Sequence, residues 1–214
     1  MDARTPPDGA PPRDAEATKR RILDASRAEF ARHGFGGARV ERIAKAARAN
    51  KRMLYYHVGN KEALFLAALE AAYDDIRRAE QSLHLEEFAP LEAIERLIRF
   101  TWDYFVENPD FITLLNTENL HRARHLKRSK RVGAMNSPVI ATIAGLLERG
   151  VKAGAIRGGI DPVQLYVSIA GLCYFYLSNA HTLSVVFDRD LLSGPVMAER
   201  VDHVVSLVTA ALRA

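Results

Sequence analysis

Amide, cationic, phenolic and imidazole side chains lie close together near residue 54 of this 214-residue chain. Lys and Arg can donate hydrogen bonds to guanine O6 and N7, and Asn can pair with adenine N6 and N7. The same groups can bind phosphate oxygens, which fixes the register of a protein on a duplex. This chemistry predicts nucleic-acid recognition by five residues: Asn50, Lys51, Arg52, Tyr56 and His57.

Two short helices must position these side chains. Val40, Ile43, Ala44 and Ala47 follow the i, i+3, i+4, i+7 spacing that places one apolar stripe on one helical face. After about three residues a second helix begins, in which Leu54 and Val58 are one turn apart and face inward. Two helices joined by a tight turn predict a helix-turn-helix, whose second helix enters the major groove.

The segment resembles the DNA-binding domain of the tetracycline-repressor (TetR) family of transcriptional regulators. The resemblance covers roughly residues 15 to 76, with several elements in the family's order and spacing. These elements are a first helix at Lys19–His33, Gly34-Phe35, Ile43-Ala44, Leu54-Tyr55-Tyr56-His57-Val58 and Lys61-Glu62-Ala63-Leu64.

The resemblance implies a role for each matching residue. Lys61 resembles a lysine that holds a phosphate at the start of the fourth helix. Tyr55 is a further candidate contact, although a tyrosine beside Leu54 could equally pack inward. The recognition-helix contacts implied are Lys51, Arg52, Tyr56 and His57.

Three residues depart from the family's pattern. Arg48 stands where a turn glycine is usual, so it must adopt a left-handed or near-helical conformation at a cost of about 1 kcal/mol. Arg39 stands where a capping threonine is usual. Because a cation is unfavourable at a helix start, we expect Arg39 to reach for a phosphate. Val58 replaces a common phenylalanine, and none of the three removes the fold.

Charge is distributed unevenly along the chain. Residues 13–62 carry a net charge of +7, whereas residues 63–214 carry −2, within a total of +4. A localised basic region is typical of a nucleic-acid-binding protein whose affinity falls with salt. Charge alone would equally fit a solvated helical surface, and the motif decides between the two interpretations.

Residues 1–13 are rich in Pro, Gly and charge and show no apolar periodicity, which predicts a disordered tail. They contain no apolar segment of the kind found in a signal peptide.

Residues 162–187 contain no formally charged side chain, and their length is that of a membrane-spanning helix. Polar side chains interrupt this stretch, and the other segments are amphipathic, so we expect no membrane span. A helix that is apolar nearly all round is a buried helix, and here a second copy of the chain would cover it.

Helical periodicity continues to the end of the chain, without a convincing alternating strand pattern. We therefore predict an all-α fold of about nine helices: an N-terminal three-helix helix-turn-helix domain at residues 15–76 and a helical effector-binding and dimerisation domain at residues 77–214. The expected later helices are a fourth through Ile76, a fifth from Leu91 to Phe105, a sixth over residues 111–122, a seventh over 138–151, an eighth over 162–186 capped by Asp161, and a ninth from Pro195.

Family resemblance implies a homodimer through the helices at about residues 162–187 and 195–213, with the valine stripe of the last helix at the interface. A two-fold dimer presents two recognition helices to successive major grooves, so the double-stranded operator should be a palindrome.

The resemblance also implies that the fifth to eighth helices hold a small-molecule effector. The segment Asn108–Leu126 looks like that of family members linked to catabolism of small aromatic or heteroaromatic compounds. Each aromatic residue there could equally be plain core. The candidate effector-binding residues are Trp102, Phe105, Phe111, Asn116, Asn119, Tyr174 and Asn179.

Other groups favour structural interpretations. Glu118, His121 and His125 could place three metal ligands on one helical face, but a polar helix end is the preferred interpretation, and we expect no metal site. The six cations between residues 122 and 131 predict a solvated loop or a charged rim, or a group that holds an anionic effector. Cys173 is the only cysteine, which predicts a small buried residue, a reducing cytoplasmic location and no disulfide.

No phosphate-binding loop, nucleophile elbow or zinc-protease motif is present, so we expect neither an enzyme nor a cofactor. The sequence predicts a cytoplasmic, sequence-specific transcriptional repressor released from its operator by a small molecule. The alternative is a helical protein-interaction or architectural DNA-binding protein without effector control.

Overall fold

The computed structural model describes residues 12–214, without the side chains of residues 12–15, His57, Asn136 and Ser137. Nine α-helices and no strand are present within these residues, which confirms the all-α prediction. They are α1 (Pro12–Gly37), α2 (Val40–Ala46), α3 (Lys51–Val58), α4 (Lys61–Gln81), α5 (Pro90–Glu107), α6 (Pro109–Leu120), α7 (Val132–Lys152), α8 (Pro162–Val186) and α9 (Gly194–Leu212), with single 3-10 turns at η1 (Leu85–Glu87) and η2 (Leu126–Arg128).

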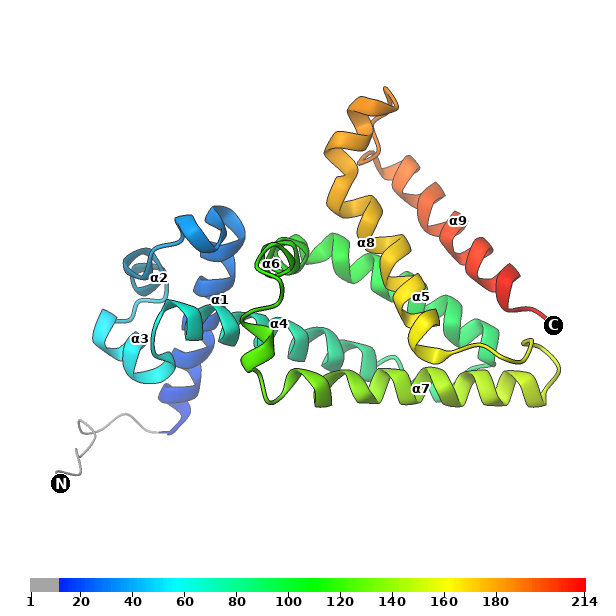
Figure 1. Ribbon diagram of the computed structural model, residues 1–214, viewed down its shortest axis with the longest axis horizontal. Coiled ribbons are helices and arrows are strands. Elements are labelled where there is room, and N and C mark those ends of the chain that lie inside the picture. Colours follow the sequence, from blue (N-terminus) through cyan, green and yellow to red (C-terminus); the bar gives the residue numbers. More distant parts are fainter. Residues whose placement is uncertain (1–11) are drawn as a thin grey trace.

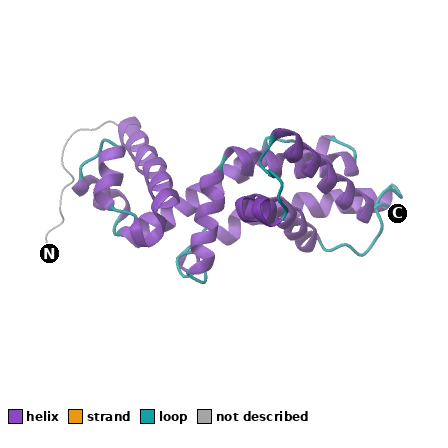
Figure 2. Cartoon of the chain, turned by 90° about the horizontal axis from the view of Figure 1, so that it is seen from above, coloured by secondary structure: helices purple, strands orange, loops and turns teal. Residues whose placement is uncertain are grey.

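The molecule is elongated, with a small N-terminal group of helices at one end and a larger helical body at the other (Figures 1 and 2). Helices α1 to α3 form the first group, and α4 runs from it into the body. The predicted domain boundary at residue 76 therefore lies within one continuous helix, α4. Residues 1–11 of the predicted tail lie outside the described residues, whereas Pro12 and Arg13 already belong to α1.

The core of the N-terminal group forms from the apolar stripes that the sequence shows. Ile43, Leu54 and Phe65 are fully buried, one each from α2, α3 and α4. The ring of Phe30 on α1 packs edge-on against Phe65, with centroids 4.9 Å apart. The guanidinium of Arg27 donates to Asp75 at 2.6 Å, which joins α1 to α4.

The body is built from α5 to α9. Asp161 caps α8, because its side chain accepts hydrogen bonds from the backbone N–H groups of Val163 and Gln164. Pro162 occupies the first turn, where a missing N–H costs nothing. The predicted start and end of this helix are confirmed. None of the helices in residues 12–214 is long and apolar enough to cross a membrane.

Two predictions of helix position need correction. Helix α7 begins at Val132 rather than at Pro138, and Pro138 lies inside it. The hydroxyl of Ser129 accepts from the N–H groups of Arg131 and Val132, so the helix can begin before the proline. Helix α6 covers residues 109–120 rather than 111–122. Pro109 occupies its first turn, and Arg122 and Ala123 beyond its end have positive φ.

The valine stripe of α9 does not face outward as predicted for a dimer interface. Val204, Val205, Val208 and Leu212 are buried within the same protomer, where α9 packs on α5 and α8. An ion pair of 2.8 Å between Arg99 and Asp202 joins α9 to α5. The outward face of α9 carries other residues, of which Leu207 is exposed.

A buried carboxylate fixes the end of α6. Glu118 accepts hydrogen bonds from the backbone N–H groups of His125 and Leu126 at 2.8 and 2.9 Å, and its Oε2 lies 2.6 Å from Nδ1 of His125. Both side chains are almost fully buried. The third candidate metal ligand, His121, places Nδ1 2.8 Å from the carbonyl of Thr117.

Replacement of Glu118 should therefore destabilise the fold strongly. Glu118→Ala leaves two backbone donors and His125 without their buried partner, which should lower the free energy of unfolding by about 3–5 kcal/mol. Urea denaturation followed by circular dichroism measures this change. Asn119→Ala, at the exposed neighbouring position, should change the value by less than about 0.5 kcal/mol. Equal losses from the two variants would contradict the role of Glu118.

Arg48 provides a second test, in the turn between α2 and α3. Its φ of 52° is left-handed, as its replacement of a turn glycine predicts. Arg48→Gly should be more stable than Arg48→Ala by about 1 kcal/mol, because alanine keeps the Cβ that opposes this conformation. Both variants lose the same charge, so the difference in urea midpoints isolates the backbone effect. Equal urea midpoints of the Arg48→Ala and Arg48→Gly variants would show that the turn is not strained.

Candidate nucleic-acid interface

The outer face of α3 carries most of the predicted DNA-contacting side chains. Leu54 is fully buried and Val58 half-buried, so they hold the opposite face of the helix against the core. Tyr55 is 43% exposed and Tyr56 66%, and Arg52 is also exposed. Tyr55 therefore lies outside rather than packing inward. His57 belongs to α3, but its side chain lies outside the described part of the structure.

Asn50 precedes α3 and caps it. Its amide oxygen accepts a hydrogen bond of 2.7 Å from the backbone N–H of Met53. This bond occupies one of the two lone pairs of the amide oxygen, so a pairing with adenine would have to share the oxygen with the helix cap. Its amide N–H groups can still donate, and phosphate oxygens near a helix N-terminus are suitable acceptors.

Lys51 is held at the start of α3 by a neighbour that sequence reasoning missed. Its ammonium group lies 2.5 Å from a carboxylate oxygen of Glu41 on α2. The hydrogen bond and the attraction between the two charges raise the pKa of Lys51 and lower the pKa of Glu41. Lys51 thus stays positively charged, and a DNA group must compete with Glu41 to bind it. The sequence signal was an acidic residue in the first turn of α2.

Lys61 and Arg39 lie at the starts of the other two helices. Lys61 opens α4 and donates to the carbonyl of Gly36 at 3.2 Å, which places it beside the connection from α1 to α2. Arg39 immediately precedes α2, its side chain is exposed, and its backbone N–H donates to Glu29 at 2.8 Å. Glu29 also accepts from Arg42, so one α1 carboxylate fixes the start of α2.

The six-cation segment after α6 contacts α4 as well as solvent. Arg124 and Arg128 both bind the carboxylate of Glu62, at 3.1 and 2.5 Å. Arg131 binds Asp74 at 2.7 Å. Glu62 directly follows Lys61, so this segment of the body holds the end of α4 that lies at the interface.

The predicted effector-binding aromatic residues of α5 and α6 are packed in the core, whereas Tyr174 on α8 is half-buried. Trp102 lies against Tyr176, with ring centroids 5.5 Å apart, and Phe105 stacks on Phe111 at 5.9 Å. All three predicted aromatics from α5 and α6 are buried.

The predicted polar groups are only partly brought together. The hydroxyl of Tyr174 donates to the amide oxygen of Asn116, which joins α8 to α6. Asn119 donates to the carbonyl of Leu115, and Asn179 donates to that of Phe175 at 2.8 Å, so each bonds to its own helix.

Cys173 is fully buried on α8, as predicted for a small core residue. Burial raises the pKa of its thiol to about 12, so the thiolate needed for redox chemistry is disfavoured.

Comparisons with known proteins agree with this geometry. Residues 22–68 match the family described as "Bacterial regulatory proteins, tetR family", and residues 90–208 match "Tetracyclin repressor-like, C-terminal domain". The chain is 37% identical over 205 residues to the HTH-type transcriptional repressor NicS of Pseudomonas putida, covering 96% of this chain and 97% of that protein. It is 30% identical over 201 residues to the regulator RutR of Escherichia coli K12, covering 94% and 93%.

Solved structures show the same fold. A TetR family transcription regulator from Marinobacter aquaeolei superimposes with a TM-score of 0.71 at 21% identity, covering 94% of this chain and 98% of that one. The helix-turn-helix packs on the core through one face and exposes cationic and aromatic side chains on the other. Two family domains match the chain, and two relatives match it over more than nine-tenths of their length. The chain belongs to the TetR family of DNA-binding transcriptional regulators.

Proposed function

We propose that this regulator is a repressor that binds a palindromic operator as a homodimer and leaves it when a small molecule binds the helical body. The observation that carries the proposal is the outer face of α3, where Lys51, Arg52, Tyr55 and Tyr56 lie exposed above a buried Leu54. Such a face fits the major groove, and the basic residues 13–62 attract the phosphate backbone. The names of the relatives support repression.

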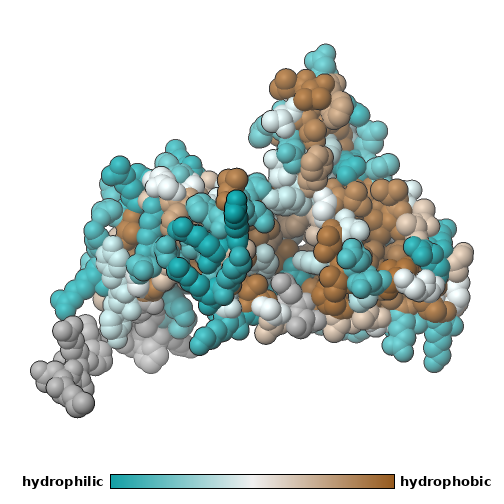
Figure 3. Space-filling model, in the orientation of Figure 1, coloured by the Kyte–Doolittle hydropathy of each residue, from teal (hydrophilic) through white to brown (hydrophobic). Residues whose placement is uncertain are grey.

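The two recognition helices require a second protomer. An exposed stripe that winds along α8 contains the apolar side chains of Val163, Val167, Phe175 and Val186, with exposed Gly171 and Thr182 between them. Apolar side chains also gather at the far end of α8, on the surface shown in Figure 3. Large exposed apolar side chains along one helix are typical of a protein–protein interface, and α8 with the outer face of α9 supports the dimer.

A ligand would act by preferring a conformation of the dimer in which the two recognition helices no longer match successive major grooves. Binding then shifts the population away from the DNA-bound form, and DNA weakens ligand binding by the same factor. Support for a response of this kind comes from α4, because one helix joins Lys61 at the interface to the interior of the body.

Selection of bound genomic fragments tests the operator. The purified protein is mixed with fragmented DNA from its source genome at near-physiological salt, and the retained DNA is sequenced. We expect enrichment of one palindromic site, whose neighbouring genes then suggest effectors. Retention without sequence preference would instead favour an architectural DNA-binding protein.

Two lysines should affect binding to the selected site in different ways. Lys51→Ala should reduce discrimination between the operator and a mismatched site by about 1–3 kcal/mol, because a base contact is lost. Lys61→Ala should weaken binding to both sites equally. The slope of log affinity against log salt concentration should become shallower by about one, because one phosphate contact is lost. Fluorescence anisotropy at several salt concentrations measures both effects. Lys152→Ala on α7 is the control, and an equal loss on both sites from Lys51→Ala would show that Lys51 binds phosphate.

The dimer is tested at Phe175, which is 58% exposed in the stripe on α8. Phe175→Asp should convert the dimer into a monomer, because a carboxylate would be buried without a partner in the interface. Sedimentation velocity measures the state of association. Val151→Asp places the same charge at an exposed position of α7 and should leave the dimer intact. A dimer that persists with Asp at position 175 would place the interface elsewhere.

A further inference from the structure

A buried arginine on α4 has more hydrogen-bonding capacity than its surroundings use. Arg77 is only 6% exposed, and its Nη2 donates to the hydroxyl of Tyr166 on α8 at 2.8 Å. Its Nη1 lies 2.6 Å from Oε2 of Glu80, yet the two groups are misaligned for a hydrogen bond. Nε and Nη1 of Arg77 and Oε2 of Glu80 thus have no hydrogen-bond partner among the described residues. Such groups are rare in protein interiors and costly.

The charge of Arg77 is also incompletely balanced. Burial raises the pKa of Glu80 to about 7, and the attraction of Arg77 only partly opposes this effect. At neutral pH Glu80 is therefore protonated in a large fraction of molecules, whereas the guanidinium is always charged. A buried cation whose charge is only partly neutralised can bind a further anion.

Space for that anion adjoins Arg77. A cavity of about 40 Å³ lies beside Arg77 and Glu80, walled by Leu85, Leu97 and Val139. It is large enough for one small polar group but not for a whole metabolite. An open groove of about 750 Å³ lies between α1, α4 and α7, and its lining shares Arg77, Gln81 and Pro138 with that of the cavity.

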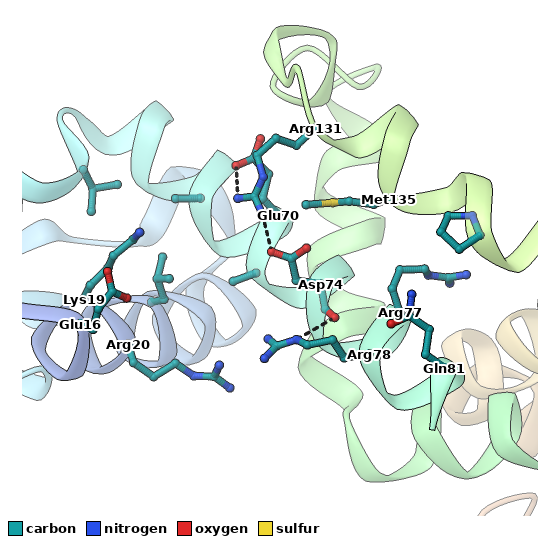
Figure 4. A pocket seen from close by; sticks show the side chains of 15 residues that line it. Glu16, Lys19, Arg20, Glu70, Asp74, Arg77, Arg78, Gln81, Arg131 and Met135 are labelled. Atoms are coloured by element: carbon teal, nitrogen blue, oxygen red, sulfur yellow. Dashed lines mark hydrogen bonds and ion pairs between the residues drawn. The ribbon is translucent and has the colours of Figure 1, made fainter. Parts of the chain in front are cut away.

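The groove can hold the remainder of an amphipathic molecule. Figure 4 shows Arg77 and Gln81 near the body end of the groove, away from Glu16 and Lys19 at its other end. Leu23, Ala71 and Met135 contribute apolar surface to its lining. Other cations of the lining are already paired, because Arg20 and Arg78 lie against Asp75 and Arg131 binds Asp74. Arg77 differs from them, since its Nε and Nη1 have no hydrogen-bond partner among the described residues.

We infer that Arg77 binds the carboxylate of a small organic acid whose apolar part lies in the groove between α1, α4 and α7. A guanidinium forms charge-assisted hydrogen bonds with a carboxylate, and Nε and Nη1 of Arg77 each have a donor that no hydrogen bond uses. The inference rests on the proposed function, for which it names the chemical class of the effector. Arg77 lies on the same helix as Lys61, sixteen residues or roughly 24 Å along it.

Matched acids and amides test this assignment on the full chain without DNA. Isothermal titration calorimetry at pH 7 compares benzoate, phenylacetate and butanoate with benzamide, phenylacetamide and butanamide. At least one acid should bind about tenfold or more tightly than its amide, because only the acid forms a charge-assisted pair with Arg77. Arg77→Gln should abolish this preference. Arg78→Gln is the control, since Arg78 is adjacent, exposed and paired with Asp75 at 2.6 Å.

Glu80→Gln keeps the assignment testable if Arg77→Gln does not fold. This variant removes the carboxylate that competes for Arg77 and should tighten acid binding several-fold while leaving amide binding unchanged. Three results would overturn the assignment: acids and amides of equal affinity, no binding of any acid at millimolar concentration, or equal effects of Arg77→Gln and Arg78→Gln. Because no DNA is present, these results do not depend on whether genomic selection finds an operator.

Discussion

The buried carboxylate of Glu118 is the interaction on which the arrangement of the two ends of this molecule depends. Two backbone N–H groups and the ring of His125 bind it, in an environment almost without solvent. A carboxylate is stable in such a place only when its hydrogen-bonding capacity is used. The segment after α6 is therefore held in one conformation, and its positive-φ residues Arg122 and Ala123 are tolerated as part of the turn.

The N-terminal helices are attached to the body through this segment. The ring of His125 lies 4.8 Å from the rings of both Phe35 and Phe65, which belong to the DNA-binding end. Arg124 and Arg128 bind Glu62, the residue after Lys61. Each surface ion pair contributes little by itself, but the buried pair fixes the backbone that carries both arginines, so less backbone entropy is lost when they bind. The position of the interface thus depends on chemistry inside the body.

Local signals explain what the sequence could predict. The stripe of Val40, Ile43 and Ala44, the cap at Asp161 and the left-handed turn at Arg48 depend on residues close in the chain, and the structure agrees with each. The start of α7 and the direction of the valine stripe of α9 were predicted wrongly, because both depend on contacts with distant parts of the chain. The hydroxyl of Ser129 accepts from the N–H groups at the start of α7, and α5 covers the valines. Periodicity shows that a helix has an apolar face but not which surface covers it.

Polar residues at the interface and in the interior differed in how far they could be predicted. The exposure of Lys51, Arg52 and Tyr56 follows from the helical spacing around a buried Leu54. The hydrogen bond that Asn50 makes as a cap and the ion pair of Lys51 with Glu41 depend on three-dimensional geometry that spacing does not give. Arg77 and Glu80 are three residues apart, and Tyr73 lies one turn before Arg77, so spacing alone places them on one face of α4. Such a pair in a sequence normally indicates a solvated ion pair. Only burial, with donors left unbonded beside an opening, distinguishes a ligand-binding arginine from a surface one.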